Sequence, residues 1–379
     1  MPVPLLDVNA QNHAIADELR EAFDRVLESG RFIMGDEVEK FEASIAEFVG
    51  SKHAIGVSSG TDAILLSLMA LGIGHGDEVI CPSFTFFATA GCITRTGATP
   101  VFCDCHPDNF NIDFDSAEQC ISDRTKAIIP VHLFGQSVDM DTCGAFAKKH
   151  NLAVIEDTAQ SLGAKYGDKS CGSMSDFGTY SFFPSKNLGG LGDGGLVVTQ
   201  DDQLADIATK MRNHGMHPKY YHQMVGGNFR LDALQAALLR VKFSHYADYT
   251  EQRQQNAAYY LEQLAEVDGI TLPSIDDGNT HIWNQFTLRV SDGKRDQLKQ
   301  SLMDQGIGCD VYYPVPMHKQ ECFAAHAQDA RTSLTVTDQL ATEVLSIPVY
   351  PELNREQQDL VISALRDFQT SRLPDFLTS

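Results

Sequence analysis

The chain has 379 residues, of which 43% are hydrophobic and 21% are charged, so its length fits two domains and its composition excludes disordered and collagen-like classes. The formal net charge is −22, from 29 lysines and arginines against 51 aspartates and glutamates. This balance disfavours general nucleic-acid binding and a polybasic membrane attachment. An anionic ligand must therefore be held locally, by helix N-termini and loop amides.

Apolar periodicity predicts the elements of the first part in chain order. We expect helices over 13–29, 38–48, a stretch after 61 that ends at 72, 85–96, 139–150 and 203–213. We expect strands over 54–57, 77–81, 100–103, 126–131, 152–156, 180–183 and 195–199. Strands that alternate with helices indicate βαβ units and a mainly parallel sheet.

The pattern changes after about residue 245. Helices are predicted over 234–241, 252–264, 294–305, 337–345 and 355–368, and strands over 270–272, 286–290 and 311–313. We therefore divide the chain into a large domain, 1–245, and a smaller C-terminal α+β domain, 246–379.

Nine cysteines, an odd number in a long chain, disfavour a disulfide framework and fit a reducing cytoplasm. The closest pair, Cys103 and Cys105, has no second Cys/His pair at structural-zinc spacing, so we expect the end of a buried strand and no metal. The first residues lack the basic and apolar regions of a signal peptide, and no apolar run is long enough for a membrane span. A cytoplasmic location is the expectation.

The turn at 58–62 (SSGTD) lies between a strand and an apolar helix. A helix N-terminus offers free N–H groups and a partial positive charge, which can hold a phosphate, and Ser59 and Thr61 could add hydroxyl donors. Plain helix capping by serine or threonine explains the same residues equally well.

The strand at 152–156 leads into two carboxylates, Glu156 and Asp157. In open α/β sheets the carboxyl ends of strands face the ligand crevice, where Asp157 would suit a cationic heteroatom or a hydroxyl. The alternative is a solvated strand end, and for Glu156, which points to the other side of the strand, we expect no more than that.

Lys186 follows an aromatic strand that carries Ser181 and precedes a glycine-rich loop. Pro184 and the pair Gly189 and Gly190 disfavour a helix, so the lysine is expected on a turn in apolar surroundings. Desolvation lowers the pKa of an ammonium and exposes a nucleophilic amine, which suits Schiff-base chemistry. The alternative is an ordinary loop lysine that reaches water.

Residues 190–195 (GLGDGG) match the G-x-G-x-x-G pattern. A dinucleotide fingerprint must follow a strand and open a helix, whereas this segment opens the strand 195–199. We therefore reject a dinucleotide site here. The glycines instead make a tight turn or let the backbone pass close to a cofactor.

Pyridoxal phosphate needs a phosphate cradle, a partner for its ring nitrogen and a lysine for a Schiff base, and these three parts converge in the segments above. The ring also needs a face to stack on. Phe84, Phe86 and Phe87 offer aromatic faces at the end of the second strand, and we expect two of the three to be ordinary core.

Taken together, these residues resemble the DegT/DnrJ/EryC1/StrS family of pyridoxal-phosphate-dependent nucleotide-sugar aminotransferases. The resemblance rests on 30–35 (GRFIMG), 59–63 (SGTDA), 76–80 (GDEVI), 84–89 (FTFFAT), 156–160 (EDTAQ), 181–189 (SFFPSKNLG), 227–232 (GNFRLD) and 312–318 (YYPVPMH). It implies a fold-type I pyridoxal-phosphate transferase, an α/β protein with a large, mainly parallel sheet and a smaller C-terminal domain.

The resemblance also implies the site. Lys186 would hold the cofactor and shuttle a proton, Asp157 would pair with the pyridinium nitrogen, Gln160 would contact the phenolic side of the ring, and Phe86 would stack on it. Phosphate contacts would come from Gly60, Thr61, Asp62 and Ser181, and from Asn228 of the neighbouring subunit, so a homodimer is implied. Tyr313 and His318 match positions on the sugar-nucleotide side, and Arg230 and Lys219 are our candidates for the diphosphate.

Some relatives carry histidine in place of the lysine and dehydrate or deoxygenate sugars, so Lys186 favours transamination. The implied function is transfer of an amino group from L-glutamate to a 3-keto or 4-keto sugar linked to UDP or dTDP, in amino-sugar or polysaccharide biosynthesis. The segments 220–222 and 226–228 favour a UDP-linked 2-acetamido-3-keto sugar. A sugar dehydratase of the same fold and a non-catalytic regulatory or ligand-sensing relative are the alternatives.

Overall fold

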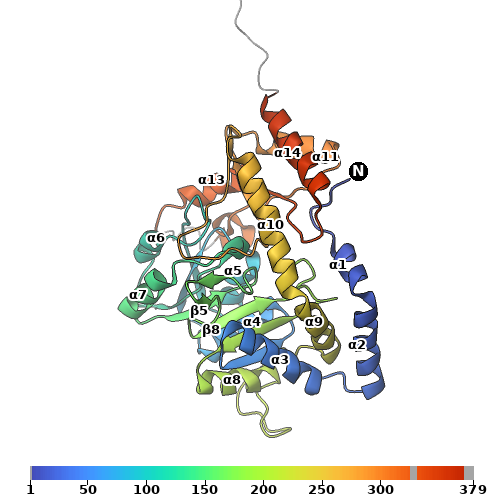
Figure 1. Cartoon of the computed structure of the whole chain (residues 1–379). Coiled ribbons are helices and arrows are strands. Elements are labelled where there is room, and N and C mark those ends of the chain that lie inside the picture. The colour runs from blue at the N-terminus through green and yellow to red at the C-terminus, as the bar shows by residue number, and fades with distance from the viewer. Residues whose placement is uncertain (1, 325–330, 371–379) are drawn as a thin grey trace, which may run out of the picture.

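The computed structural model describes residues 2–324 and 331–370. A layered part with a large sheet forms the lower left of Figure 1, and the C-terminal helices and a small sheet lie above it, joined by the long helix α10. No helix in the described ranges is both long and apolar enough to cross a lipid bilayer.

The large sheet has seven strands in the order β1-β9-β8-β5-β4-β2-β3. The strands are β1 (His53–Val57), β2 (Glu78–Pro82), β3 (Thr99–Cys103), β4 (Thr125–Ile128), β5 (Ala153–Asp157), β8 (Phe177–Ser181) and β9 (Gly195–Thr199). Only β9 runs against its two neighbours, so the other six strands run in the same direction. A two-stranded sheet, β6 (Lys165–Tyr166) and β7 (Lys169–Ser170), lies apart from it.

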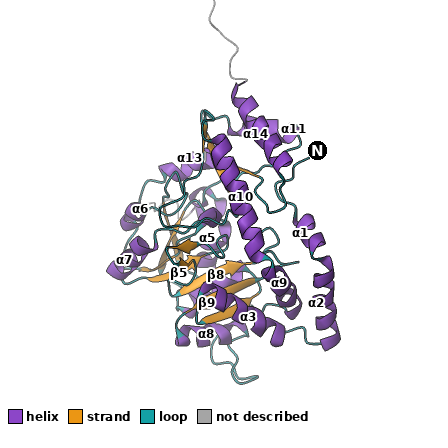
Figure 2. Ribbon diagram, viewed as in Figure 1, coloured by secondary structure: helices purple, strands orange, loops and turns teal. Residues whose placement is uncertain are grey.

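Helices cover both faces of this sheet (Figure 2). The helices of this part of the chain are α1 (Val8–Ala14), α2 (Ala16–Ser29), α3 (Asp36–Val49), α4 (Gly60–Ala70), α5 (Phe87–Arg95), α6 (Phe114–Gln119), the short turn η1 (Leu133–Gly135), α7 (Met140–His150), α8 (Asp202–Arg212) and α9 (Ala233–Ser244), of which α2 packs on α9 at the side. All five residues of β2 are buried, as expected for a parallel strand covered on both faces. Val79 packs in the cluster that contains α4, and Ile80 packs with α7 on the other face.

The C-terminal part has a three-stranded antiparallel sheet in the order β10-β11-β12. Its elements are α10 (Tyr246–Leu264), β10 (Ile270–Thr271), β11 (Phe286–Val290), α11 (Arg295–Asp304), η2 (Met317–Lys319), η3 (Glu321–Phe323), α13 (Thr335–Glu343), β12 (Val344–Ile347) and α14 (Arg355–Thr370). The division at 245/246 remains a proposal, and it falls where α10 begins. Residues 325–330 and 371–379 of the proposed small domain lie outside the described residues.

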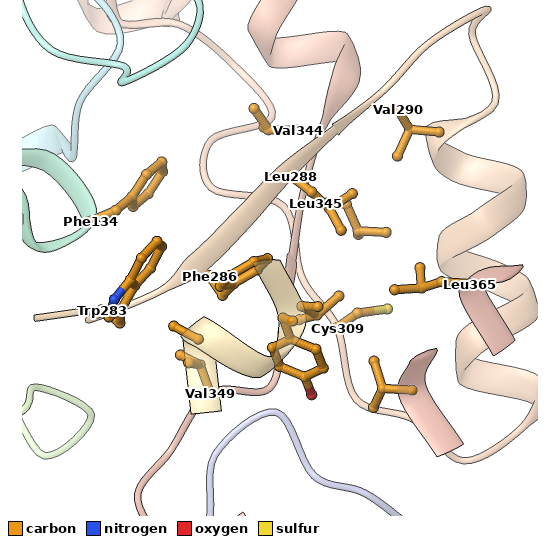
Figure 3. Close-up of a cluster of buried hydrophobic side chains, with 14 of the residues drawn as sticks. Phe134, Trp283, Phe286, Leu288, Val290, Cys309, Val344, Leu345, Val349 and Leu365 are labelled. Carbon is orange, nitrogen blue, oxygen red and sulfur yellow. The ribbon is translucent and has the colours of Figure 1, made fainter. Parts of the chain in front are cut away.

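One buried apolar cluster joins the two parts (Figure 3). It contains Trp283, Phe286 and Leu365 from the C-terminal part, and Phe134 from the turn that follows β4. Val3 is in the same cluster, and its amide donates to the carbonyl of Gly306 at 2.9 Å. The first residues therefore pack with the C-terminal part of the chain.

Several predicted elements differ from the structure. The helix predicted at 252–264 already begins at Tyr246, and the strand predicted at 126–131 ends at Ile128. The predicted helix 13–29 is two helices, because the backbone leaves the helical region at Ile15. The strand predicted at 180–183 lies at 177–181. No strand spans 311–313, where Asp310 makes a single bridge with Ser346. The helix predicted to end at 345 ends at Glu343, since the buried run 344–347 (VLSI) pairs with β11 instead.

Lys242 on α9 is fully buried, and its ammonium donates one hydrogen bond to the side-chain oxygen of Asn12 at 3.1 Å. Burial lowers the pKa of Lys242 to about 8, although Glu352 opposes the shift. The unfolded chain, with a lysine pKa of about 10.4, binds more protons between these two values, so stability should rise with pH across this window. Below this pH window Lys242 is charged in the folded protein, and the full free-energy cost of burying its ammonium reduces the stability.

We therefore expect Lys242→Met to raise the free energy of unfolding at pH 7 by roughly 1–4 kcal/mol, because it removes a buried charge that forms no ion pair among the described residues. Urea unfolding at pH 7 and pH 9.5 measures this, and the variant should gain less stability between the two pH values than the parent does. Lys40→Met, at an exposed position of α3, is the matched control. A Lys242→Met protein that is less stable at pH 7 would contradict the prediction.

Candidate active site

The predicted site residues gather at one edge of the large sheet. β1, β2, β5 and β8 all end there, and β9, which runs the other way, begins there. The chain leaves this edge through the turn before α4, the segment before α5, Asp157 and Ser181. Carboxyl ends of parallel strands are the usual place for a ligand in such sheets.

The turn before α4 forms a small cradle. Ser59 is the N-cap of α4 and accepts from the amide of Asp62 at 3.0 Å. A Cβ at Gly60 would lie only 2.6 Å from the Cβ of Ser181, so the end of β8 and the start of α4 touch at this point. The amides of Gly60 and Thr61 have no acceptor among the described residues, and they can serve an anion.

Asp62 differs from the other cradle residues. Its amide is used by the Ser59 cap, and its carboxylate accepts from the hydroxyls of Ser58 at 2.6 Å and Ser59 at 3.1 Å. Asp62 therefore orders the turn, and the amides left for a phosphate are those of Gly60 and Thr61.

Gly60→Ala tests the cradle. The added methyl group must displace Ser181, so we expect the affinity for pyridoxal phosphate to fall at least about tenfold, which is about 1.4 kcal/mol. Titration of the cofactor-free protein, followed by absorbance, measures the dissociation constant. Gly144→Ala is the control, because no atom lies within 4 Å of its added Cβ. Unchanged affinity in Gly60→Ala would show that the cradle does not bind the phosphate.

Asp157 is buried at the end of β5. One carboxylate oxygen accepts from the hydroxyl of Thr89 at 2.8 Å, and the other accepts from the amide of Ala159 at 3.2 Å. Burial raises the pKa of Asp157, and these hydrogen bonds oppose the shift. A buried carboxylate held by two donors is ready to pair with a protonated ring nitrogen. The sequence analysis missed the role of Thr89, although this residue lies in the segment 84–89, four positions after Thr85.

Glu156 is not a solvated strand end, contrary to the expectation. It is fully buried on the opposite side of β5, where it lies 2.9 Å from His132 Nε2 and accepts from the amides of Gly172 and Met174 and from the hydroxyl of Ser175. A buried carboxylate that is this fully hydrogen-bonded has a structural role.

Lys186 lies on a turn after β8, as predicted, and its amide donates to the carbonyl of Phe183 at 2.8 Å. The turn is tight, because a Cβ at Gly189 would lie 2.3 Å from the carbonyl oxygen of Pro184. Burial of the ammonium lowers the pKa of Lys186 to about 8, and the Asp157 carboxylate opposes the shift. An amine with this pKa is partly neutral near pH 8 and can act as a nucleophile or a base.

The glycine-rich segment opens β9 and no helix, so the rejection of a dinucleotide fingerprint is consistent with the structure. Its glycines make room for the protein itself. A Cβ at Gly195 would lie 2.3 Å from the backbone of Ser59, so this glycine lets the cradle turn cross the start of β9.

Aromatic side chains lie beside the site. Phe86 is 56% exposed, and its ring centroid is 6.1 Å from that of Tyr313. Phe84 is core, as expected, but Phe87 is 46% exposed and stacks on Phe323, so only one of the two phenylalanines assigned to the core is buried.

Gln160 is held from two sides. Its side-chain oxygen accepts from the amide of Phe134 at 2.7 Å, and its nitrogen donates to the hydroxyl of Tyr313 at 3.2 Å. Burial raises the pKa of Tyr313, which keeps this hydroxyl protonated. Tyr313 therefore lies against a predicted cofactor residue as well as on the predicted sugar side.

Both ring nitrogens of His318 already have protein partners. Nδ1 is 2.7 Å from the Ser83 hydroxyl, and Nε2 is 3.1 Å from an oxygen of Asp338. Burial lowers the pKa of His318. The ring fixes the segment at η2 to the end of β2, and a substrate could reach it only by displacing one of these partners.

The remaining predicted residues lie on or beside the loop between α8 and α9, which projects at the bottom of Figure 1. Arg230 pairs with Val57 at the end of β1 and donates to the side-chain oxygen of Asn213 at 2.7 Å. Asn228 is exposed and is two residues away from this pairing. Lys219 is exposed, and its Nζ lies over the ring of Tyr220, 5.0 Å from the ring centroid.

The arrangement fits pyridoxal phosphate on structural grounds alone. The cradle has free amides beside Ser181, the buried Asp157 can face a cationic ring nitrogen, and the same edge carries an amine with a lowered pKa. These are the phosphate, ring and covalent contacts that this cofactor requires.

Comparison with known sequences agrees with this chemistry. The model of the DegT/DnrJ/EryC1/StrS aminotransferase family matches residues 13–366. A protein of Geobacillus stearothermophilus named pleiotropic regulatory protein is 48% identical over 370 residues, 97% of this chain and 99% of that protein. The UDP-N-acetyl-3-dehydro-alpha-D-glucosamine 3-aminotransferase of Acidithiobacillus ferrooxidans is 43% identical, over 96% of this chain and 97% of its own length. The dTDP-3-amino-3,4,6-trideoxy-alpha-D-glucose transaminase of Streptomyces venezuelae is 42% identical, over 97% and 96%.

Solved structures share the whole fold. The crystal structure of Streptomyces venezuelae DesV in complex with a ketimine intermediate has a TM-score of 0.94 and 41% identity, and the match covers 99% of this chain and 100% of that chain. NtdA of Bacillus subtilis, solved with bound cofactor PMP, has a TM-score of 0.91 and 32% identity, over 97% of this chain and 85% of that chain.

Proposed function

Because this chain belongs to the DegT/DnrJ/EryC1/StrS aminotransferase family and is a pyridoxal-phosphate-dependent nucleotide-sugar aminotransferase, we propose that it transfers the amino group of L-glutamate to a keto-sugar linked to UDP or dTDP. The observation that carries the proposal is Lys186, an amine with a pKa of about 8 near the buried carboxylate of Asp157. A lysine at this position supports transamination over dehydration.

We propose the following roles for the chain's own residues. Ser181 and the amides of Gly60 and Thr61 hold the cofactor phosphate, and Phe86 covers one face of the ring. Asp157 pairs with the ring nitrogen and keeps it protonated. Gln160, fixed by Phe134 and Tyr313, contacts the phenolic side.

When bound, pyridoxal phosphate supplies an electron sink that makes the α-hydrogen of the donor acidic. Lys186 would move the proton: Nζ would take it from the donor α-carbon as general base and would return it, as general acid, to the carbon of the cofactor that carries the nitrogen. The same two roles run in reverse on the sugar. The chemistry therefore depends on an amine that is neutral when it accepts the proton, and the lowered pKa of Lys186 supports this.

We propose a homodimer in which Asn228 reaches the phosphate of the neighbouring subunit. Its exposed position beside the Arg230 pairing leaves it available for such a contact. Arg230 and Lys219 remain our candidates for the sugar diphosphate, with Tyr313 and His318 on the sugar side. Of these residues, Lys219 lies on the projecting loop, so it would have to contact the diphosphate in the active site of the neighbouring subunit.

For the sugar, we favour a UDP-linked 2-acetamido-3-keto substrate. The relative whose name includes such a sugar is 43% identical to this chain, and the relative named for a dTDP-sugar is 42% identical, so identity alone does not separate the carriers. A panel of UDP- and dTDP-linked 3-keto and 4-keto sugars, generated in situ and assayed with L-glutamate, tests both points. Formation of an amino sugar with matching 2-oxoglutarate supports the proposal. Dehydration without nitrogen transfer, or no turnover with any keto-sugar, would overturn it.

A further inference from the structure

A small cavity lies beside the turn that carries Lys186. Its volume is about 60 Å³, and its wall includes Ser185 and Tyr312, the chain neighbours of the site residues Lys186 and Tyr313. The wall is otherwise formed by the first residues of the chain, α10 and the small sheet, and it includes the polar side chains of Arg253, Asn284 and Gln285. Of all these residues, Ser185 is the exposed one.

Arg253 is the charged residue in the wall of this cavity. It lies on α10, is 3% exposed, and donates from Nη1 to the carbonyl of Trp283 at 3.0 Å. Its Nε has no acceptor, and no carboxylate in the described ranges forms an ion pair with it. Burial lowers the pKa of Arg253 to about 10, although Glu352 and Tyr246 oppose the shift. A buried guanidinium without an anion is costly, and the cost falls if a ligand supplies the negative charge.

The cavity is coupled to the turn of Lys186. Asn284 is 7% exposed and donates to the side-chain oxygen of Asn187 at 2.9 Å, and Asn187 in turn donates to the carbonyl of Ile282 at 2.8 Å. The side-chain oxygens of Asn284 and Gln285 are buried without a donor. The side chain of Gln285 makes no hydrogen bond within the part of the chain that the structure describes, so its amide can turn its NH₂ group towards an anion.

We propose that this cavity is a carboxylate-binding subsite, with Arg253 as its cation and Gln285 as a second donor. Its volume of about 60 Å³ leaves room for a small group such as one carboxylate. On the proposed function, the occupant is a carboxylate of the amino donor. A free small carboxylate has the same chemistry, and the experiment distinguishes the two.

The test uses the full-length holoenzyme with three variants. Arg253→Lys keeps the charge but loses Nε–H and the planar guanidinium, Arg253→Met keeps the volume without the charge, and Val349→Leu fills the cavity from its buried apolar wall. Arg20→Met, on the exposed side of α2, is the matched control. Circular dichroism and cofactor absorbance report whether each variant is folded, and Val349→Leu keeps the test valid if the Arg253 variants do not fold.

Two measurements are made on each protein: the dissociation constant of glutarate by calorimetry, and the KM values for L-glutamate and for the keto-sugar. We expect glutarate binding to weaken at least about tenfold in the cavity variants. A parallel rise in the KM for L-glutamate, with the KM for the sugar unchanged, identifies the donor as the occupant. Weaker glutarate binding with both KM values unchanged identifies a free carboxylate.

If glutarate does not bind the parent protein, or binds all variants equally, and both KM values are unchanged, the cavity holds only water and the proposal is overturned. Failure of the proposed function would look different: the parent would form no amino sugar, while the glutarate measurement would still report on the cavity.

Discussion

Lys186→Ala is expected to abolish detectable turnover, a loss of at least about 10³-fold, because the same amine holds the cofactor and moves the proton, and general acid–base catalysis alone contributes about 10²–10⁴-fold. The parent protein should be yellow with bound pyridoxal phosphate. Borohydride reduction and peptide mass mapping should then attach the mass of the cofactor to Lys186.

Two controls accompany this variant. Lys169→Ala removes a lysine from the exposed position of β7 and should leave turnover unchanged. Added primary amines such as methylamine should restore part of the lost activity, because they replace the missing base without restoring the attachment. A Lys186→Ala enzyme that keeps a tenth of the parent's turnover would refute the role assigned to this residue.

Asp157→Asn should lower kcat by about 10²–10³-fold, the usual range for loss of one preorganised electrostatic contact. The amide keeps the shape of the carboxylate and its acceptor for Thr89, but it cannot hold a positive charge on the ring nitrogen. The measurement is kcat for amino-sugar formation, with the dissociation constant of pyridoxal phosphate as a second readout. The loss should lie mainly in kcat.

Thr89 supplies a graded companion to this variant. It is fully buried, and its hydroxyl donates a hydrogen bond to Asp157. We therefore expect Thr89→Val to lower kcat about tenfold, which is a loss of about 1.4 kcal/mol in transition-state stabilisation. Thr89→Ser keeps the hydroxyl and should recover most of the rate. Equal rates in Asp157→Asn and the parent would show that this carboxylate does not act on the ring.

The site could be predicted from the sequence where its signals are local. The turn at Lys186 follows from Pro184 and the glycines near it, and the position of Asp157 follows from the end of a buried strand. Long-range partners carry no such signal. Thr89 and Asp157 are 68 positions apart, and His318 and Ser83 are 235 positions apart. The spacing of residues along the chain therefore indicates neither contact.

The same reason explains the errors in the fold. The run Val344–Ile347 has four residues, and its apolar pattern suits the end of a helix as well as a strand. Only pairing with β11, more than fifty residues earlier, selects the strand. Glu156 was assigned to solvent because its partners, His132 and the segment 172–175, are brought to it by the packing of separate loops.

The contact between Val3 and the stretch around Gly306 has a consequence for the order in which the molecule can be made. Val3 is synthesised about three hundred residues before the backbone groups that bind it. The large sheet can assemble while synthesis continues. The segment around Val3, however, stays unpaired until the C-terminal sheet and helices have been synthesised. Docking of the first residues is thus a late event of folding, and it also completes the cavity wall that Leu5 and Leu6 provide beside Arg253.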